Sequence, residues 1–159
     1  MKLRSGIFFA GVSLVAMVMA GITASNANDS VAKAVSDPNG WAIAGHDYGN
    51  TRFSPLKQIN SENAGKLQLV YSLSLASLRS NESSPVVIGK NLYVSTSWGP
   101  KYVYAIDAAT GARKWTWQPD IPDDVLQYAC CDVNNRGVSY ADGKIFVGQI
   151  GRASCRERV

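Results

Sequence analysis

The residues with the most distinctive chemistry lie in one short stretch, where adjacent Cys130 and Cys131 are followed five residues later by Arg136. Adjacent Cα atoms are about 3.8 Å apart, below the roughly 4.4–6.8 Å that ordinary disulfides span, so a bond between these cysteines would close a strained ring. Such a ring offers a rigid sulfur surface on which a planar ligand could lie, and Arg136 could bind the ligand's anionic edge. The alternative is a pair of buried free thiols.

The first 27 residues predict a secretory signal. They begin with the basic residues Lys2 and Arg4, continue in an apolar run from Gly6 to Ala20, and end in small residues. This order is typical of a cleavable signal, and we place the cleavage after Ala27. The apolar run is too short for a comfortable membrane span, and no other segment approaches about 18 apolar residues, so we expect no membrane span. Export into an oxidising compartment favours the disulfide.

Residues 150–159 differ from the chain before them, because they show neither the period of a strand nor that of a helix. Their sequence resembles the translation of a common short-read sequencing adapter. We therefore interpret residues 150–159 as an artefact joined to residues 28–149, so that Cys155 has no biological partner. The alternative is a genuine charged C-terminus.

The net positive charge comes from the two ends of the chain. The chain has 16 lysine and arginine residues and 12 aspartate and glutamate residues. The signal contributes two of the basic residues, and the last ten residues contribute three basic and one acidic, so residues 28–149 are neutral overall. Nothing in that part predicts a basic face for nucleic acid or an anionic membrane.

Short strands dominate the chain after residue 66. Period-2 alternation predicts a strand over Leu67–Leu75, and turn residues then separate three hairpins. The paired segments are 85–88 with 91–95, 102–106 with 113–117, and 137–140 with 144–147. The third hairpin restates the first at an offset of about 53 residues, and a sheet that recurs at such a period is typical of a propeller blade. The fold class is therefore all-β.

The second hairpin carries a motif with a family likeness. Its sequence from Ala105 to Trp115 resembles the tryptophan-docking motif of quinoprotein propellers, in which alanine, aspartate, threonine-glycine and tryptophan recur in each blade. Asp107 and Thr110 can satisfy the amides of the turn, Gly111 can supply an unusual backbone angle, and the ring of Trp115 can pack on a neighbouring blade. The motif indicates a fold and not a function, because propellers without catalytic activity share it.

Three further segments resemble the N-terminal part of periplasmic alcohol dehydrogenases that use pyrroloquinoline quinone (PQQ), the methanol/ethanol dehydrogenase family. They are 81–87, 128–132 and 135–144, and the likeness extends over essentially all of residues 28–148. The resemblance implies an eight-bladed β-propeller, of which residues 28–149 would form only the N-terminal blades.

The resemblance also implies roles for individual residues. In this family an adjacent-cysteine disulfide stacks on one face of PQQ, which we assign to Cys130 and Cys131. A glutamate and an arginine bind the edge of the cofactor, which we assign to Glu82 and Arg136. A stacking surface and a cationic fork suit a planar tricarboxylate. Glu82 needs a donor on the ligand or a proton of its own, since carboxylates repel one another.

By the same resemblance, the full-length protein would oxidise a primary alcohol to an aldehyde in the periplasm and pass electrons to a cytochrome c. It could be a homodimer. A calcium or lanthanide ion would polarise the quinone carbonyl. The metal ligands and the catalytic aspartate fall after residue 149 in this family, so we assign no catalytic and no metal-binding residue and expect residues 28–149 alone to be inactive.

Two alternative functions explain part of the sequence. A non-catalytic propeller that scaffolds outer-membrane assembly would share the signal and the tryptophan motif, but it would explain neither the cysteine pair nor Arg136. Within the enzyme class, sugar and aldehyde dehydrogenases of the same superfamily generally lack adjacent cysteines.

The single histidine, His46, is interpreted as a loop residue and not as a metal ligand or general base.

Overall fold

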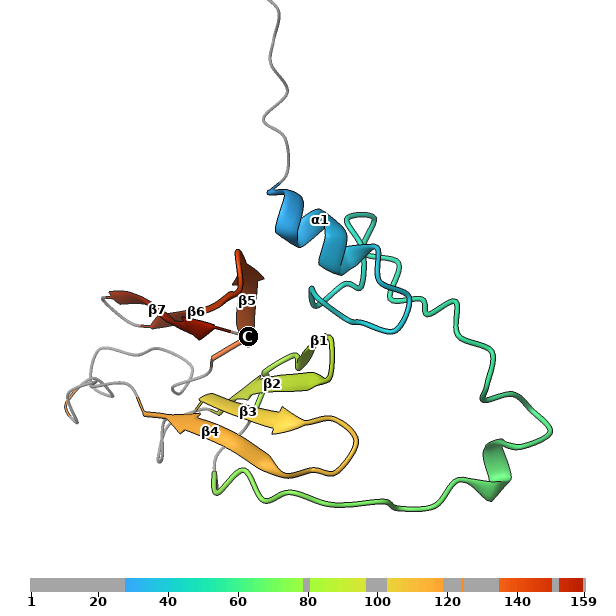
Figure 1. The fold of residues 1–159 in the computed structure, drawn as a ribbon. Helices are drawn as coiled ribbons and strands as arrows, with labels where there is room; N and C mark the ends of the chain where they lie inside the picture. Colours follow the sequence, from blue (N-terminus) through green and yellow to red (C-terminus); the bar gives the residue numbers. More distant parts are fainter. Residues whose placement is uncertain are drawn as a thin grey trace, which may run out of the picture.

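The computed structural model describes residues 28–78, 81–96, 103–118, 124, 135–149 and 152–158. These residues form two antiparallel sheets, a short helix and long connecting segments (Figure 1). The first sheet consists, in spatial order, of β1 (Val86–Ile88), β2 (Asn91–Ser95), β3 (Val103–Asp107) and β4 (Arg113–Trp117). The second sheet consists of β5 (Val138–Ala141), β6 (Lys144–Gln149) and β7 (Arg152–Arg158).

The three hairpins predicted from the sequence are confirmed. The strands β1 and β2 pair with Val87 opposite Leu92, and β5 and β6 pair with Ser139 opposite Phe146. In the hairpin of β3 and β4, Ala105 lies opposite Trp115, and the register shifts between Ala105 and the next residue. The turn glycines of the first and third hairpins have positive φ, 58° at Gly89 and 71° at Gly143. Glycine adopts these angles without the steric cost of a Cβ atom.

Strand β7 falls within the last ten residues, for which the sequence predicted no regular element. Its backbone pairs along the whole of β6, with Gly148 opposite Ala153. Backbone pairing explains this, because an edge strand offers a row of free N–H and C=O groups to any extended segment. The origin of residues 150–159 as an artefact stays a prediction.

The core lies between the two sheets and on the far side of the first. One face of the first sheet packs against one face of the second, and both faces contribute to a single cluster. The buried members of this cluster are Val86, Tyr93, Val103, Ala105, Val138, Ile145 and Val147. The other face of the first sheet forms a second cluster of Val94, Tyr104 and Ile106. Side chains therefore alternate between two buried faces along β2 and β3, as the period of 2 requires.

The prediction of a strand over Leu67–Leu75 is wrong. The segment is extended, but it pairs with no strand among the described residues. Its first half is exposed, with 63% of Leu67 and 82% of Leu69 accessible. Its second half lies on the first sheet, where Leu73 and Leu75 pack against the second cluster. The alternation thus reports a buried face correctly, but a strand also requires a neighbour with free backbone groups.

The N-terminal segment attaches to both sheets. Helix α1 (Asp29–Val35) begins at Asn28, whose side chain accepts hydrogen bonds from the first helical N–H groups, and lies next to β5 (Figure 1). A two-way backbone bridge then joins Trp41 to Val87 of β1. A single 3₁₀ turn, η1 (Ala64–Lys66), follows. No helix among the described residues has the length and apolar character needed to cross a membrane.

Candidate cofactor site

The turn between β3 and β4 has the geometry that its sequence motif predicts. The carboxylate of Asp107 accepts hydrogen bonds from the N–H groups of Ala109 and Thr110, at 3.1 and 3.0 Å, and from the Thr110 hydroxyl at 3.0 Å. Gly111 has a φ of 74°. These bonds fix the end of the hairpin, so that the ring of Trp115 packs against the cluster shared by the two sheets and lies 5.8 Å from the ring of Tyr93.

A backbone bridge joins the segments that lead into the two sheets. The segment before β1 and the segment before β5 run side by side in parallel, bridged at Ser84 and Gly137. The Ser84 N–H donates to the carbonyl of Arg136 at 3.2 Å. The contact is so close that a Cβ atom on Gly137 would lie 2.8 Å from the Ser84 carbonyl oxygen, and the φ of Gly137 is +121°. Glycine at this position is therefore required both by space and by backbone angle.

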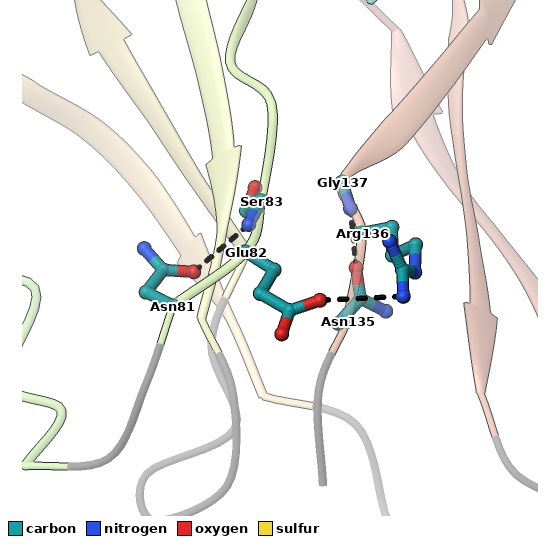
Figure 2. Close-up of polar contacts among 6 residues, drawn as sticks. All are labelled: Asn81, Glu82, Ser83, Asn135, Arg136 and Gly137. Carbon is teal, nitrogen blue, oxygen red and sulfur yellow. Dashed lines mark hydrogen bonds and ion pairs between the residues drawn. The ribbon is translucent and has the colours of Figure 1, made fainter. Parts of the chain in front are cut away.

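This junction brings together Glu82 and Arg136, two of the four residues that the sequence assigned to the cofactor. Figure 2 shows the two side chains extending toward one another from the two segments. Nη2 of Arg136 lies 3.4 Å from Oε2 of Glu82. The side chain of Arg136 is 86% exposed and that of Glu82 is 43% exposed. The pair is thus open to solvent and accessible to a ligand.

The geometry allows the pair to bind an anion. A guanidinium has five N–H donors in a fixed planar fork, and one edge of the fork suffices for one carboxylate. The glutamate therefore orients Arg136 and leaves donors for a second anionic group. The positive charge of Arg136 also lowers the repulsion between Glu82 and a ligand carboxylate. This repulsion was the objection to placing Glu82 beside a tricarboxylate cofactor.

Polar side chains lie behind the pair. Ser83 and Asn135, the immediate neighbours of Glu82 and Arg136, meet at the side chain of Ser95 at the end of β2. Ser95 is 1% exposed. No role was predicted for these residues from the sequence. A signal was available for Ser95, since alternation places it on the buried face next to Tyr93, where a hydroxyl needs partners.

The other two assigned residues, Cys130 and Cys131, lie outside the described part of the chain. Their disulfide and its contact with a cofactor stay predictions. The described residues contain no group of three or more histidine, cysteine, aspartate and glutamate side chains that could hold a metal ion.

His46 lies in the loop that follows Trp41, apart from the Glu82–Arg136 pair. Its ring packs edge-on against the ring of Trp41, with centroids 4.7 Å apart. The next residue, Asp47, accepts hydrogen bonds from the hydroxyl and the N–H of Thr51, which lower the pKa of its carboxyl. These contacts are those of a packed loop, in agreement with the interpretation of His46 as a loop residue.

Comparison with known proteins identifies the family. The model of the β-propeller domain of PQQ-dependent glucose/ethanol/alcohol dehydrogenases matches residues 41–159. A lanthanide-dependent methanol dehydrogenase of Methylacidiphilum fumariolicum is 39% identical over 82% of this chain and 21% of the relative. A 1-butanol dehydrogenase (cytochrome c) of Thauera butanivorans is 44% identical over 69% of this chain and 16% of the relative.

A solved structure agrees with these sequence relatives. The structure of a europium-containing methanol dehydrogenase superposes with a TM-score of 0.75 at 38% identity, over 82% of this chain and 23% of that chain. The chain therefore belongs to the PQQ β-propeller dehydrogenase family, and the fold predicted from its sequence is confirmed. The chain spans about a fifth of the length of the curated relatives it matches.

Proposed function

We propose that this chain is the N-terminal part of a periplasmic PQQ-dependent alcohol dehydrogenase that oxidises primary alcohols and passes the electrons to a cytochrome c. Membership of the family supports the general activity, and the relatives described above are dehydrogenases of methanol and 1-butanol. This favours the enzyme over the scaffold alternative. Alone, residues 28–149 would be inactive, since we place the catalytic aspartate and the ligands of a calcium or lanthanide ion further along the full-length protein.

The observation that carries the proposal for the site is the pairing of Glu82 with Arg136. The two residues come from segments that precede different sheets, and the chain positions them 3.4 Å apart with an exposed guanidinium. In the proposed site, Arg136 binds a carboxylate of PQQ and Glu82 holds the guanidinium in place and meets a donor on the cofactor's edge. A disulfide between Cys130 and Cys131 would cover one face of the ring system.

PQQ supplies the redox chemistry when it is bound, since it accepts the two electrons removed from the alcohol. The residues of this chain bind and orient the cofactor. Arg136 fixes it through charge-assisted hydrogen bonds, which are directional as well as strong. The metal, the substrate pocket and the catalytic base belong to the remainder of the proposed full-length enzyme.

The test measures the affinity of the full-length apoprotein for PQQ, by titration followed through the cofactor's absorbance. Replacing Arg136→Ala removes charge-assisted bonds, so we expect the Kd for PQQ to rise tenfold or more, roughly the value of one or two such bonds. Glu82→Gln should weaken binding less, because an amide can still orient the guanidinium.

Arg113→Ala is the matched control. It removes the same charge from an exposed side chain of β4, away from the pair, where Arg113 lies 4.8 Å from the centre of the Tyr104 ring. Its Kd for PQQ should equal that of the unchanged protein. If Arg136→Ala binds PQQ as tightly as Arg113→Ala does, the assignment of this site is wrong.

A further inference from the structure

We propose that Ser83, Ser95 and Asn135 are positioning residues that set the separation and orientation of Glu82 and Arg136. The inference rests on the proposed function, because it assigns a purpose to a hydrogen-bond chain behind the pair that would bind PQQ. The three residues come from three parts of the chain: the segment before β1, the end of β2 and the segment before β5.

The side chains form a continuous path between the two sheets. The Ser95 hydroxyl lies 2.7 Å from Oδ1 of Asn135 and 3.1 Å from the hydroxyl of Ser83. The backbone N–H of Ser95 donates to the Ser83 hydroxyl at 3.2 Å. Asn135 continues the path, since its Nδ2 donates to the Gly148 carbonyl of β6 at 2.8 Å. Its Oδ1 accepts from the N–H of Gly137 at 2.9 Å (Figure 2).

The number of protons on each side chain determines which group donates and which accepts along this path. A hydroxyl carries a single proton, and the shorter contact of Ser95, to the amide oxygen of Asn135, uses it. The contact between the two serine hydroxyls must then be supplied by the proton of Ser83. Oδ1 of Asn135 accepts from Ser95 and Gly137, and its amide group donates to Gly148. The chain of bonds is thereby satisfied at each step, as a buried polar network requires.

The location of the network explains why it would affect the exposed pair. Ser83 directly follows Glu82, and Asn135 directly precedes Arg136, so fixing these two residues fixes the backbone from which the pair extends. The centre of the network is rigid, because Ser95 is 1% exposed and belongs to a paired strand. The pair itself is exposed, and long exposed side chains lose entropy when they bind a ligand. A fixed backbone on both sides reduces that cost.

The experiment is a double-mutant cycle on PQQ affinity in the full-length apoprotein. Ser95→Ala removes the central hydroxyl without adding volume. We expect the Kd for PQQ to rise about fivefold, the usual value of one hydrogen bond. In the Arg136→Ala background, the same replacement should change the Kd less than about twofold, because two residues that act through one interaction are not additive.

Further variants separate positioning from general stability. Ser139→Ala, which removes an exposed hydroxyl from β5, is the matched control and should leave the Kd unchanged. Ser83→Ala repeats the test at the other hydroxyl, and Ser83→Thr, which keeps the hydroxyl, should restore the affinity. Ser83→Ala also serves as the second variant if Ser95→Ala does not fold. Melting temperatures of the apoproteins record any loss of stability separately.

The outcomes discriminate between the two proposals. An unchanged Kd in Ser95→Ala and Ser83→Ala would overturn the positioning role. So would an equal rise of the Kd with and without Arg136, since additivity indicates a structural effect that does not act through the pair. If Arg136→Ala itself leaves the Kd unchanged, the proposed cofactor site fails first, and the positioning role fails with it.

Discussion

The two sheets of this chain share one core but differ in how many of their faces are covered. The first sheet is covered on both, by the second sheet on one side and by Leu73 and Leu75 on the other. The four residues Val103–Ile106 of β3 are all buried as a result. In β6, Ile145 and Val147 are buried, whereas Phe146 between them is 38% exposed. The burial pattern of a strand therefore indicates whether its sheet is covered on one face or on both.

This difference has a simple physical cause. A strand presents successive side chains to opposite faces, so an inner strand of a sheet covered on both faces can bury every residue, whereas a strand of a sheet covered on one face buries every second one. In a propeller each blade packs between two others. The first sheet is covered on both faces, as a blade in such a ring is, whereas Phe146 on one face of the second sheet is partly exposed.

The largest expected effect tests the doubly covered face directly. Tyr104 is fully buried, and its hydroxyl donates to the Leu75 carbonyl at 3.1 Å. Tyr104→Ala should destabilise the chain by about 3–5 kcal/mol, the range for deleting a buried aromatic ring. The matched replacement on the open face, Phe146→Ala, should cost less than about 1 kcal/mol, since that ring is partly in water already. Urea unfolding of the 159-residue chain measures both. Equal losses would contradict the comparison.

A smaller loss of stability should follow from adding a methyl group where the segments before β1 and β5 contact each other. Gly137→Ala places a Cβ atom 2.8 Å from the Ser84 carbonyl oxygen at a φ of +121°. The two backbones must separate, and we expect a loss of roughly 2 kcal/mol. Gly143→Ala is the control, because its φ is also positive, at +71°, but nothing lies within 4 Å of the added atom. It should cost about 1 kcal/mol from backbone strain alone.

The measurement for this pair is the midpoint of thermal unfolding of each variant. Gly137→Ala should have the lower midpoint. If the two alanine variants unfold at the same temperature, the contact between the two segments does not stabilise the junction.

The sequence was sufficient for the elements that depend on local pattern. Turn residues and alternation located all three hairpins, and the motif around Asp107 predicted the hydrogen bonds of its turn as they occur. Alternation failed at Leu67–Leu75 because it reports a face and not a pairing partner. It was also silent on β7, whose backbone pairs along β6.

For the candidate site, the resemblance supplied Glu82 and Arg136, and the structure added their contact. No local pattern could give that contact, because it depends on two segments that meet only when the sheets pack together. The serine and asparagine network was missed for the same reason. Each of its members is an unremarkable polar residue in the sequence, and only their meeting at the buried Ser95 makes them a unit.

The smallest effect concerns the turns of the two sheets, where an aspartate has different partners. Asp142 of the second sheet accepts from the side chain of Asn28 at 2.8 Å. Asp107 of the first sheet is bonded within its own turn, and the N–H and hydroxyl of Thr110 lower the pKa of its carboxyl. A carboxyl with a lowered folded-state pKa stabilises the fold above its unfolded pKa, and this contribution is lost as the pH falls through the folded value. Thr110→Val removes the hydroxyl and should raise that pKa.

The consequence is a difference that depends on pH. At neutral pH the unchanged chain should melt above Thr110→Val, and the gap should close as the pH falls below the ordinary aspartate range and through the lowered pKa of Asp107 in the folded chain. Thr110→Ser keeps the hydroxyl and should follow the unchanged chain. Melting temperatures between pH 7 and about pH 2 give the gap, and carbon NMR of the Asp107 carboxyl gives the titration directly. A gap that stays constant with pH would mean that the Thr110 side chain stabilises the turn by packing or backbone propensity and not through its hydrogen bond to the charged Asp107.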